Sequence, residues 1–89
     1  MHYKFDIRSK EMKEYWTFEK FLEFANSYGY EFISFWNPYR IFANSNDPDE
    51  LHWLIPVYDK KVDIENVRKF KKWLKGKGIL RDEDDEEAD

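Results

Sequence analysis

The chain has 89 residues, the size of one small domain, and it contains no cysteine, which excludes disulfide bonds and cysteine-bound zinc. Its formal net charge is −4, but seven of its 19 acidic residues fall within positions 82–89. Residues 1–81 therefore hold 12 acidic and 15 basic residues. We expect a mildly basic domain followed by an acidic tail that repels itself and stays disordered.

Hydrophobic content indicates a compact domain without membrane or export signals. No stretch approaches the roughly 20 apolar residues of a membrane span, and the first residues lack the apolar run of a signal peptide. We therefore expect a cytoplasmic protein that does not contact a membrane. Aromatic residues make up 20% of the chain, and each buried ring removes about 150–250 Å² from water, so a few rings can build the core.

The first third of the chain predicts an extended segment and then a helix. Residues 3–7 alternate apolar and polar side chains, which indicates an extra strand or an extended arm laid on the sheet. Residues 9–16 are ambiguous, with Ser9 able to cap a short helical turn through Met12 and Tyr15. The first clear helix begins near Thr17, which can cap it, and Gly29 follows its last turn. Its apolar residues follow the spacing of one buried helix face: Phe18, Phe21, Leu22 and Ala25.

Three strands are predicted next, over residues 30–36, 39–43 and 51–57, because each run is rich in aromatic and β-branched residues. A turn at Asn37–Pro38 separates the first two strands, and a loop over residues 44–49, dense in turn-forming residues, separates the last two. The third strand places four apolar residues on one face: Leu51, Trp53, Ile55 and Val57. Pro56 has no N–H group, so the end of this strand should lie at a sheet edge.

Residues 58–61 lead into the last helix, with Asp63 as its N-cap. The apolar stripe of this helix is formed by Ile64, Val67, Phe70 and Leu74. Gly76 and Gly78 end the helix, and residues 79–80 can fold back on the core. The predicted fold is a single α+β domain over residues 1–81, in which a three-stranded antiparallel sheet packs on two helices in the order α-β-β-β-α.

Basic residues concentrate on the last helix and the segment that leads into it: Lys60, Lys61, Arg68, Lys69, Lys71, Lys72, Lys75 and Lys77. Such a row can follow a phosphate backbone, and each contact adds affinity that depends on salt and not on base sequence. The alternative is the ordinary solvated face of an amphipathic helix. The acidic tail could cover this helix, imitate nucleic acid or only improve solubility.

The chain has 4 Trp, 6 Tyr and 8 Phe, more rings than a core of this size can hide. We expect some of these to reach the surface: Tyr28, Tyr30, Trp36, Tyr39 and Tyr58. Exposed rings can stack on bases, a contact worth about 1–3 kcal/mol each. The alternative is core packing together with a protein-binding patch, because Trp and Tyr also anchor protein interfaces.

No enzyme motif is complete in this sequence: it has no Ser/His/Asp set, no P-loop and no glycine fingerprint. His52 lies next to Asp49 and Glu50 and could act as an acid–base, although a histidine on the polar face of a strand is the more common case. Asp47, Asp49 and Glu50 could hold a metal loosely, but loop carboxylates usually face water. We therefore assign no catalytic residue, no metal ligand and no cofactor.

The order of several short motifs resembles the HicA family of toxins. The motifs are Tyr28-Gly29-Tyr30, Phe35-Trp36-Asn37-Pro38-Tyr39-Arg40-Ile41-Phe42, Ile55-Pro56-Val57-Tyr58, Lys60-Lys61 and Lys75-Gly76-Lys77-Gly78-Ile79. The resemblance covers residues 17–80. It implies a helix, three strands and a helix in a fold related to double-stranded-RNA-binding domains, with mRNA cleavage as the activity and a HicB antitoxin as the partner.

One departure from the family pattern concerns catalysis. The family has its catalytic histidine in a Gly-Ser-His-x-x-Phe-like segment at the start of the second strand, where this chain has residues 37–42 with Tyr39 in the histidine position. A phenol with a pKa of about 10 is a poor general base near neutral pH. The later histidine of the family is replaced by Tyr58. The resemblance therefore implies a version of the fold without ribonuclease activity.

The leading hypothesis is a non-catalytic HicA-like RNA-binding module in which shape and phosphate contacts dominate, as for double-stranded RNA. The expected RNA-contacting residues are Tyr39, Arg40, Lys60, Lys61, Arg68, Lys72 and Lys75. One alternative is a small protein-binding inhibitor or adaptor, such as a phage-encoded anti-defence factor, whose partner is a HicB-like antitoxin or a component of a defence system. Another is an active mRNA-cleaving toxin that uses His52 or Tyr39. The sequence leaves open whether the protein is a monomer or a homodimer.

Overall fold

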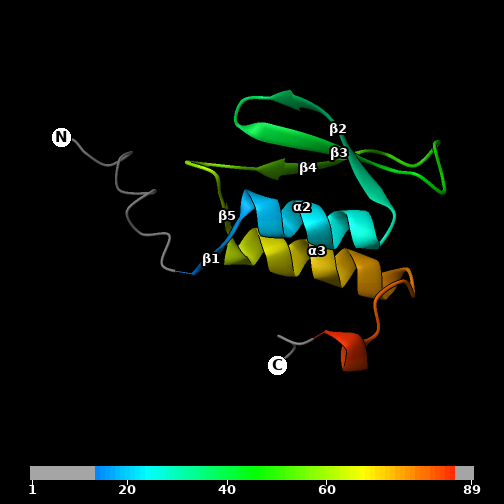
Figure 1. The fold of residues 1–89 in the computed structure, drawn as a ribbon. Helices are drawn as coiled ribbons and strands as arrows, with labels where there is room; N and C mark the ends of the chain where they lie inside the picture. Colours follow the sequence, from blue (N-terminus) through cyan, green and yellow to red (C-terminus); the bar gives the residue numbers. More distant parts are fainter. Residues whose placement is uncertain (1–13, 86–89) are drawn as a thin grey trace.

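The computed structural model describes residues 14–85 (Figure 1). It has an α+β fold that contains the predicted helix, three strands and helix in that order, together with two short strands. The elements are β1 (Tyr15–Thr17), α2 (Phe18–Ser27), β2 (Tyr30–Trp36), β3 (Tyr39–Asn44), β4 (Trp53–Pro56), β5 (Lys61–Asp63), α3 (Ile64–Gly76) and the single 3₁₀ turn η1 (Asp82–Asp84).

The three-stranded sheet is antiparallel, with the strand order β2-β3-β4. Tyr39 pairs with Trp36 of β2 and with Pro56 of β4, so β3 is central and β4 is an edge strand, as the position of Pro56 predicts. β1 and β5 form a separate antiparallel pair. Both helices lie against one face of the three-stranded sheet, and no other described element covers its second face (Figure 1).

The core lies between the sheet and the two helices, and it is built mainly from aromatic rings. The predicted stripe of α3 is confirmed, since Val67, Phe70 and Leu74 are fully buried. The ring of Phe70 lies 5.2 Å from Phe21 of α2 and 5.3 Å from Tyr30 of β2, measured between centroids. These edge-on and tilted contacts tie both helices to the sheet.

The predicted helix ends are also confirmed. The hydroxyl of Thr17 accepts a hydrogen bond from the Lys20 amide at 3.1 Å, and the carboxylate of Asp63 accepts one from the Glu65 amide at 3.0 Å. Gly29, after α2, has φ +90°, a left-handed conformation that glycine adopts without a steric penalty.

The structure differs from the sequence prediction in two strands. Tyr15 belongs to β1, where it pairs with Asp63, and not to a helical turn, because the buried ring of Trp16 fixes this segment as an extended chain beside β5. The third strand of the sheet is Trp53–Pro56 and not residues 51–57, and Leu51 is 88% exposed. The arm or strand predicted for residues 3–7 lies outside the described residues.

The prediction that the whole tail from residue 82 is disordered is wrong for its first half. Residues 82–84 form the turn η1, and the side chain of Asp85 is only 4% exposed. Its carboxylate lies 2.8 Å from Lys71 Nζ and 3.0 Å from Lys75 Nζ. Lys71 and Lys75 of α3 thus neutralise the Asp85 carboxylate and hold this part of the tail against the helix. Residues 86–89 lie outside the described part of the chain.

Candidate nucleic-acid interface

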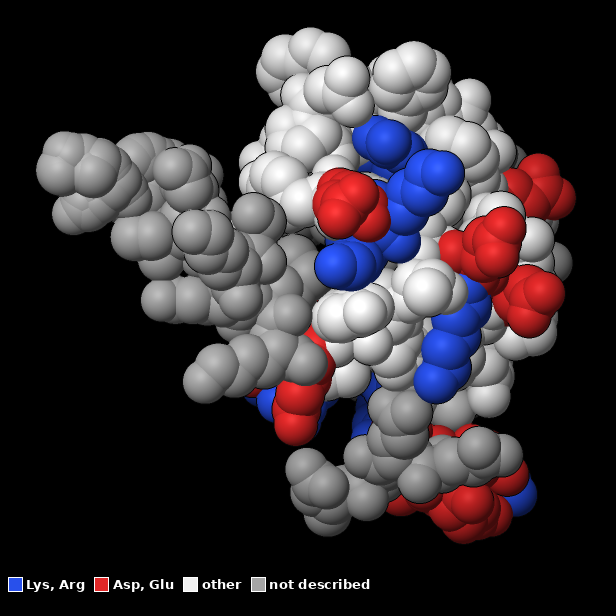
Figure 2. All heavy atoms as spheres, turned by 60° about the vertical axis from the view of Figure 1, so that its left-hand side comes forward, with Lys and Arg blue, Asp and Glu red and all other residues white. Residues whose placement is uncertain are grey.

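Three of the predicted RNA-contacting residues gather at one end of the molecule, around Phe18. The guanidinium carbon of Arg40 lies 5.9 Å from the Phe18 ring centroid, and the Phe18 amide donates to the Lys60 carbonyl at 2.8 Å. Lys60 and Lys61 line a hollow of about 470 Å³ together with Phe18 and Tyr15. We call these five residues the end surface. Figure 2 turns this end forward and shows basic side chains grouped on it, with acidic side chains beside them.

Lys60 stands in an unusual backbone conformation. Tyr58 and Lys61 exchange backbone hydrogen bonds of 3.0 and 2.9 Å across a tight turn, and the two residues between them, Asp59 and Lys60, have φ values of +54° and +62°. Aspartate tolerates this left-handed region, but for an ordinary side chain it costs about 1–2 kcal/mol relative to glycine. The turn therefore holds an exposed lysine where glycine would be more stable.

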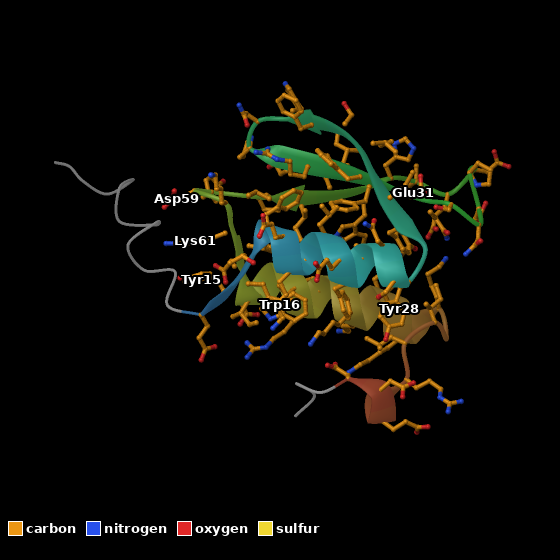
Figure 3. All side chains as sticks on the ribbon, in the orientation of Figure 1. Tyr15, Trp16, Tyr28, Glu31, Asp59 and Lys61 are labelled. Atoms are coloured by element: carbon orange, nitrogen blue, oxygen red, sulfur yellow. The ribbon has the colours of Figure 1, made fainter. Side chains whose placement is uncertain are left out.

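The cations of the end surface rest against aromatic rings. Lys61 Nζ lies 4.8 Å from the ring centroid of Tyr15 and 3.7 Å from a carboxylate oxygen of Asp59, and these three side chains stand together in Figure 3. The Asp59 side chain is 81% exposed, so this ion pair is screened by water and contributes little. Arg40 lies 5.4 Å from the Phe35 ring centroid. Arg40 also donates long hydrogen bonds to Asn37 Oδ1 at 3.3 Å and to the Pro38 carbonyl at 3.4 Å. A phosphate can therefore compete for Lys61 without displacing a buried partner.

Tyr39 does not join Arg40 on this surface. Successive side chains of a strand point to opposite faces, and Tyr39 lies on the face that the helices leave open. Its ring is 6.4 Å from Trp36, which is 71% exposed, and Ile41 and Leu54 pair across the strands on the same face. We call Trp36, Tyr39, Ile41 and Leu54 the open sheet face. The predicted RNA contacts Tyr39 and Arg40 therefore lie on opposite faces of the sheet.

The basic residues of α3 divide between two sides of the helix. Arg68, Lys71 and Lys75 lie on one side, and acidic partners neutralise them there: Arg68 pairs with Glu65 at 2.8 Å, and Lys75 pairs with both Asp82 and Asp85 at 3.0 Å. Hydrogen bonds from Lys75 to Asp85 and Asp82 raise the pKa of the lysine. Two predicted RNA contacts, Arg68 and Lys75, therefore stand on a side whose charge is already balanced.

The other side of α3 combines lysines with tryptophans. Lys69, Trp73 and Lys77 follow one another at intervals of four residues, and the ring of Trp53 from β4 lies 5.3 Å from that of Trp73. A mainly apolar groove of about 470 Å³ runs over this side, and we call it the Trp groove; it is lined by Trp53, Lys69, Lys72, Trp73, Gly76 and Lys77. Of these, only Lys72 was among the predicted RNA contacts. The four-residue spacing of lysine and tryptophan is the sequence signal that could have revealed the groove.

A hydrogen-bond network fixes the base of the Trp groove. The Trp73 indole N–H donates to the Tyr30 hydroxyl at 3.0 Å, and this hydroxyl donates to Glu50 at 3.2 Å. Glu50 also accepts from Asn44 at 2.6 Å and pairs with Lys77 at 2.9 Å. Burial alone would raise the pKa of Glu50, but hydrogen bonds from Lys77, Asn44 and Tyr30 outweigh burial and lower it. Burial and the neighbouring carboxylate raise the pKa of Tyr30, and the hydrogen bond to Glu50 raises the pKa of Lys77.

The candidate acid–base and metal residues are not assembled into a site. His52 is exposed and precedes β4, whereas Tyr39 pairs with Pro56 at the other end of that strand, so four residues of extended chain, about 13 Å, separate the two. Glu50 is held by Tyr30, Asn44 and Lys77 and is not available to His52. In residues 14–85 no three His, Asp or Glu side chains are placed to hold a metal ion.

The prediction that some rings reach the surface is confirmed for Trp36 and Tyr58, which are 71% and 44% exposed. Tyr28 and Tyr39 are half-buried. Tyr30 is buried, because its hydroxyl joins the Glu50 network beneath the Trp groove. The two exposed rings of this set therefore lie at the β2–β3 hairpin and in the turn that precedes β5.

Comparison with known proteins leaves the fold and these surfaces as the basis for functional inference. No protein-family model, no curated protein and no solved structure matches the chain. Within residues 14–85, neither α2 nor α3 combines the length and the apolar composition that crossing a membrane requires.

Proposed function

We propose that this protein is a non-catalytic, HicA-like RNA-binding module that holds the phosphate backbone at its end surface. One observation carries the proposal: Arg40 lies about 20 residues before Lys60 and Lys61 in the sequence, and the three come together around Phe18 at one end of the fold. Three cations in one place favour a polyanion because each phosphate contact releases counterions. The order of helix, three strands and helix is also the order that the family resemblance implies.

The turn at Lys60 adds a second, independent argument. Strained backbone in native proteins concentrates at functional sites, because elsewhere substitution removes it without loss. Glycine or asparagine at position 60 would relieve the strain, yet the chain has a lysine whose φ is +62°. We take this as evidence that the charge of Lys60 is used, with phosphate as the partner.

The substitution Lys60→Gly tests this reasoning because its two effects have opposite signs. It should stabilise the fold by about 0.5–1 kcal/mol, since glycine adopts the left-handed turn conformation without steric cost but loses more entropy on folding. It should also weaken binding of an RNA hairpin and lower the slope of log K against log salt by about 0.7–0.9. Urea denaturation and fluorescence anisotropy with labelled RNA measure the two effects.

Arg81→Ala is the matched control, since it removes one exposed cation from the far end of α3, where Arg81 pairs with Glu83. It should leave the RNA affinity and the salt slope unchanged. Wild-type protein that binds no RNA at low salt would end the proposal. A Lys60→Gly protein that is more stable and binds RNA as tightly as wild type would remove Lys60 from the interface.

The open sheet face favours a second candidate function, binding to a partner protein. Trp36 and Leu54 are 71% and 46% exposed, and their face has no described element over it. Exposed aromatic and aliphatic groups of this kind anchor protein interfaces. Under this candidate the partner is a HicB-like antitoxin or a component of a defence system. Titration of such a partner by calorimetry should give binding that Trp36→Ala and Leu54→Ser abolish and Lys60→Gly leaves intact.

A further inference from the structure

The Trp groove has the chemistry of a binding site and lies apart from the end surface. Trp73 is 37% exposed, and its ring packs on that of Trp53 with 5.3 Å between the centroids and an inclination of 38°; both indoles line the groove. Gly76 contributes no side chain, and a Cβ placed there would meet nothing within 4 Å. The groove is therefore open above this part of α3, and its lining is mainly apolar.

The orientation of the Trp73 ring is fixed in the free protein by a hydrogen bond. Its N–H donates to the hydroxyl of Tyr30, which is 1% exposed and is itself held by Glu50. An indole anchored by its edge cannot turn about its side-chain bonds without breaking this hydrogen bond. A ligand that stacks on a fixed ring loses less free energy to the ordering of the protein than one that must trap a mobile ring.

The positive charge of the lysines that line the Trp groove indicates an anionic ligand. Lys77 Nζ lies 5.1 Å from the Trp73 ring centroid, where Glu50 partly balances its charge. Lys69 and Lys72 are exposed, and no acidic side chain of residues 14–85 forms an ion pair with either. On the opposite side of α3 the cations do have acidic partners. Among the described residues of α3, the lysines without an acidic partner therefore lie on the side that carries Trp73.

We propose that the Trp groove binds an unpaired base of single-stranded RNA, which stacks on Trp73 while Lys69 and Lys72 contact the phosphates that flank it. The inference rests on the proposed function and deepens it, because it names the form of RNA. Bases in a duplex are stacked on one another and cannot enter the groove, whereas single strands present their faces to aromatic side chains. The groove and the end surface together suit a hairpin with a single-stranded extension.

The test compares two RNA probes with the full-length protein: a labelled 12-nucleotide oligouridine and a blunt RNA duplex of 12 base pairs. Fluorescence anisotropy at low salt should show that Lys69→Ala combined with Lys72→Ala weakens oligouridine binding about 5- to 100-fold, and that Trp73→Leu does the same. Duplex binding should fall less than threefold in both variants. Trp36→Leu, which removes an exposed tryptophan from the hairpin, is the matched control and should keep the oligouridine affinity.

Thermal denaturation shows whether the Trp73→Leu protein is folded. The variant with Lys69→Ala and Lys72→Ala tests the same groove by changing only exposed side chains, which should leave the fold intact. Equal losses for the duplex and the oligouridine would overturn base stacking, because the lysines would then contact only phosphate. Unchanged oligouridine binding in the lysine variant, with a loss in Lys60→Gly, would overturn the groove and leave the end surface standing. If wild type binds neither RNA but binds a polyglutamate peptide through Lys69 and Lys72, both proposals fail and the groove is a site for acidic proteins.

Discussion

Removal of the Glu50 carboxylate should destabilise the fold far more than removal of any exposed acidic residue. In Glu50→Ala, the amide of Asn44, which is 7% exposed, and the hydroxyl of Tyr30, which is 1% exposed, both lose their acceptor. A buried polar group left without a partner costs about 1–3 kcal/mol, so the two together predict a loss of about 2–5 kcal/mol. A domain of this size has a total stability of about 5–10 kcal/mol, so the variant should lose a large fraction of it.

Urea denaturation followed by far-UV circular dichroism measures this loss, with Glu31→Ala as the control. Glu31 is an exposed glutamate on β2 (Figure 3), and its removal should change stability by less than about 0.5 kcal/mol. Similar unfolding midpoints for the Glu50→Ala and Glu31→Ala proteins would refute the network, and with it the argument that Trp73 is held in place.

The pH dependence of the folding stability of wild type and of Glu50→Ala gives a second check on the Glu50 network. The pKa of Glu50 is lowered in the folded protein, so below the unfolded value of about 4.3 the unfolded chain binds more protons than the native chain. The stability that Glu50 contributes is therefore complete above about pH 5 and is lost as the pH falls through the folded pKa. The difference in stability between wild type and Glu50→Ala should narrow over this acidic range. A constant difference from pH 7 to pH 3 would contradict the assignment.

Two further pairs of variants test the backbone and the docked tail. Gly29→Ala should destabilise by more than about 1 kcal/mol, because φ is +90° and the new Cβ would lie 3.0 Å from a neighbouring asparagine side chain, whereas Gly76→Ala should stabilise by about 0.5–1 kcal/mol, since it adds helix propensity in open space. Thermal melts that rank these two the other way would disprove the reasoning. Asp85→Ala should cost about 2 kcal/mol in urea denaturation, because it removes an acceptor 2.8 Å from the buried ammonium of Lys71, while the exposed Asp84→Ala should cost almost nothing. Equal stabilities for the Asp85 and Asp84 variants would show that the tail does not dock.

The local chemistry of the sequence was sufficient for the two helices and for the three strands of the main sheet, but not for β1, β5 or the turn η1. Thr17 and Asp63 are side chains that satisfy the free amides of a first helical turn, and the structure uses both as N-caps. The apolar spacing of α3 repeats with the helical period, so it marks the buried face without reference to any other element. Leu51 shows the limit of this approach, because an apolar residue in a strand-like run is buried only if a partner element lies opposite it.

Ion pairing and the meeting of distant residues were decided only by the tertiary structure. The sequence shows eight basic residues on α3 and the segment that leads into it, but it does not show that Asp82 and Asp85 fold back to neutralise one side of the helix. The Trp groove depends on a contact between residues 53 and 73, and the end surface depends on one between residues 18 and 40. Side-chain periodicity fixes which face a residue occupies on its own element, whereas the neighbours of that face depend on how the sheet and the helices pack.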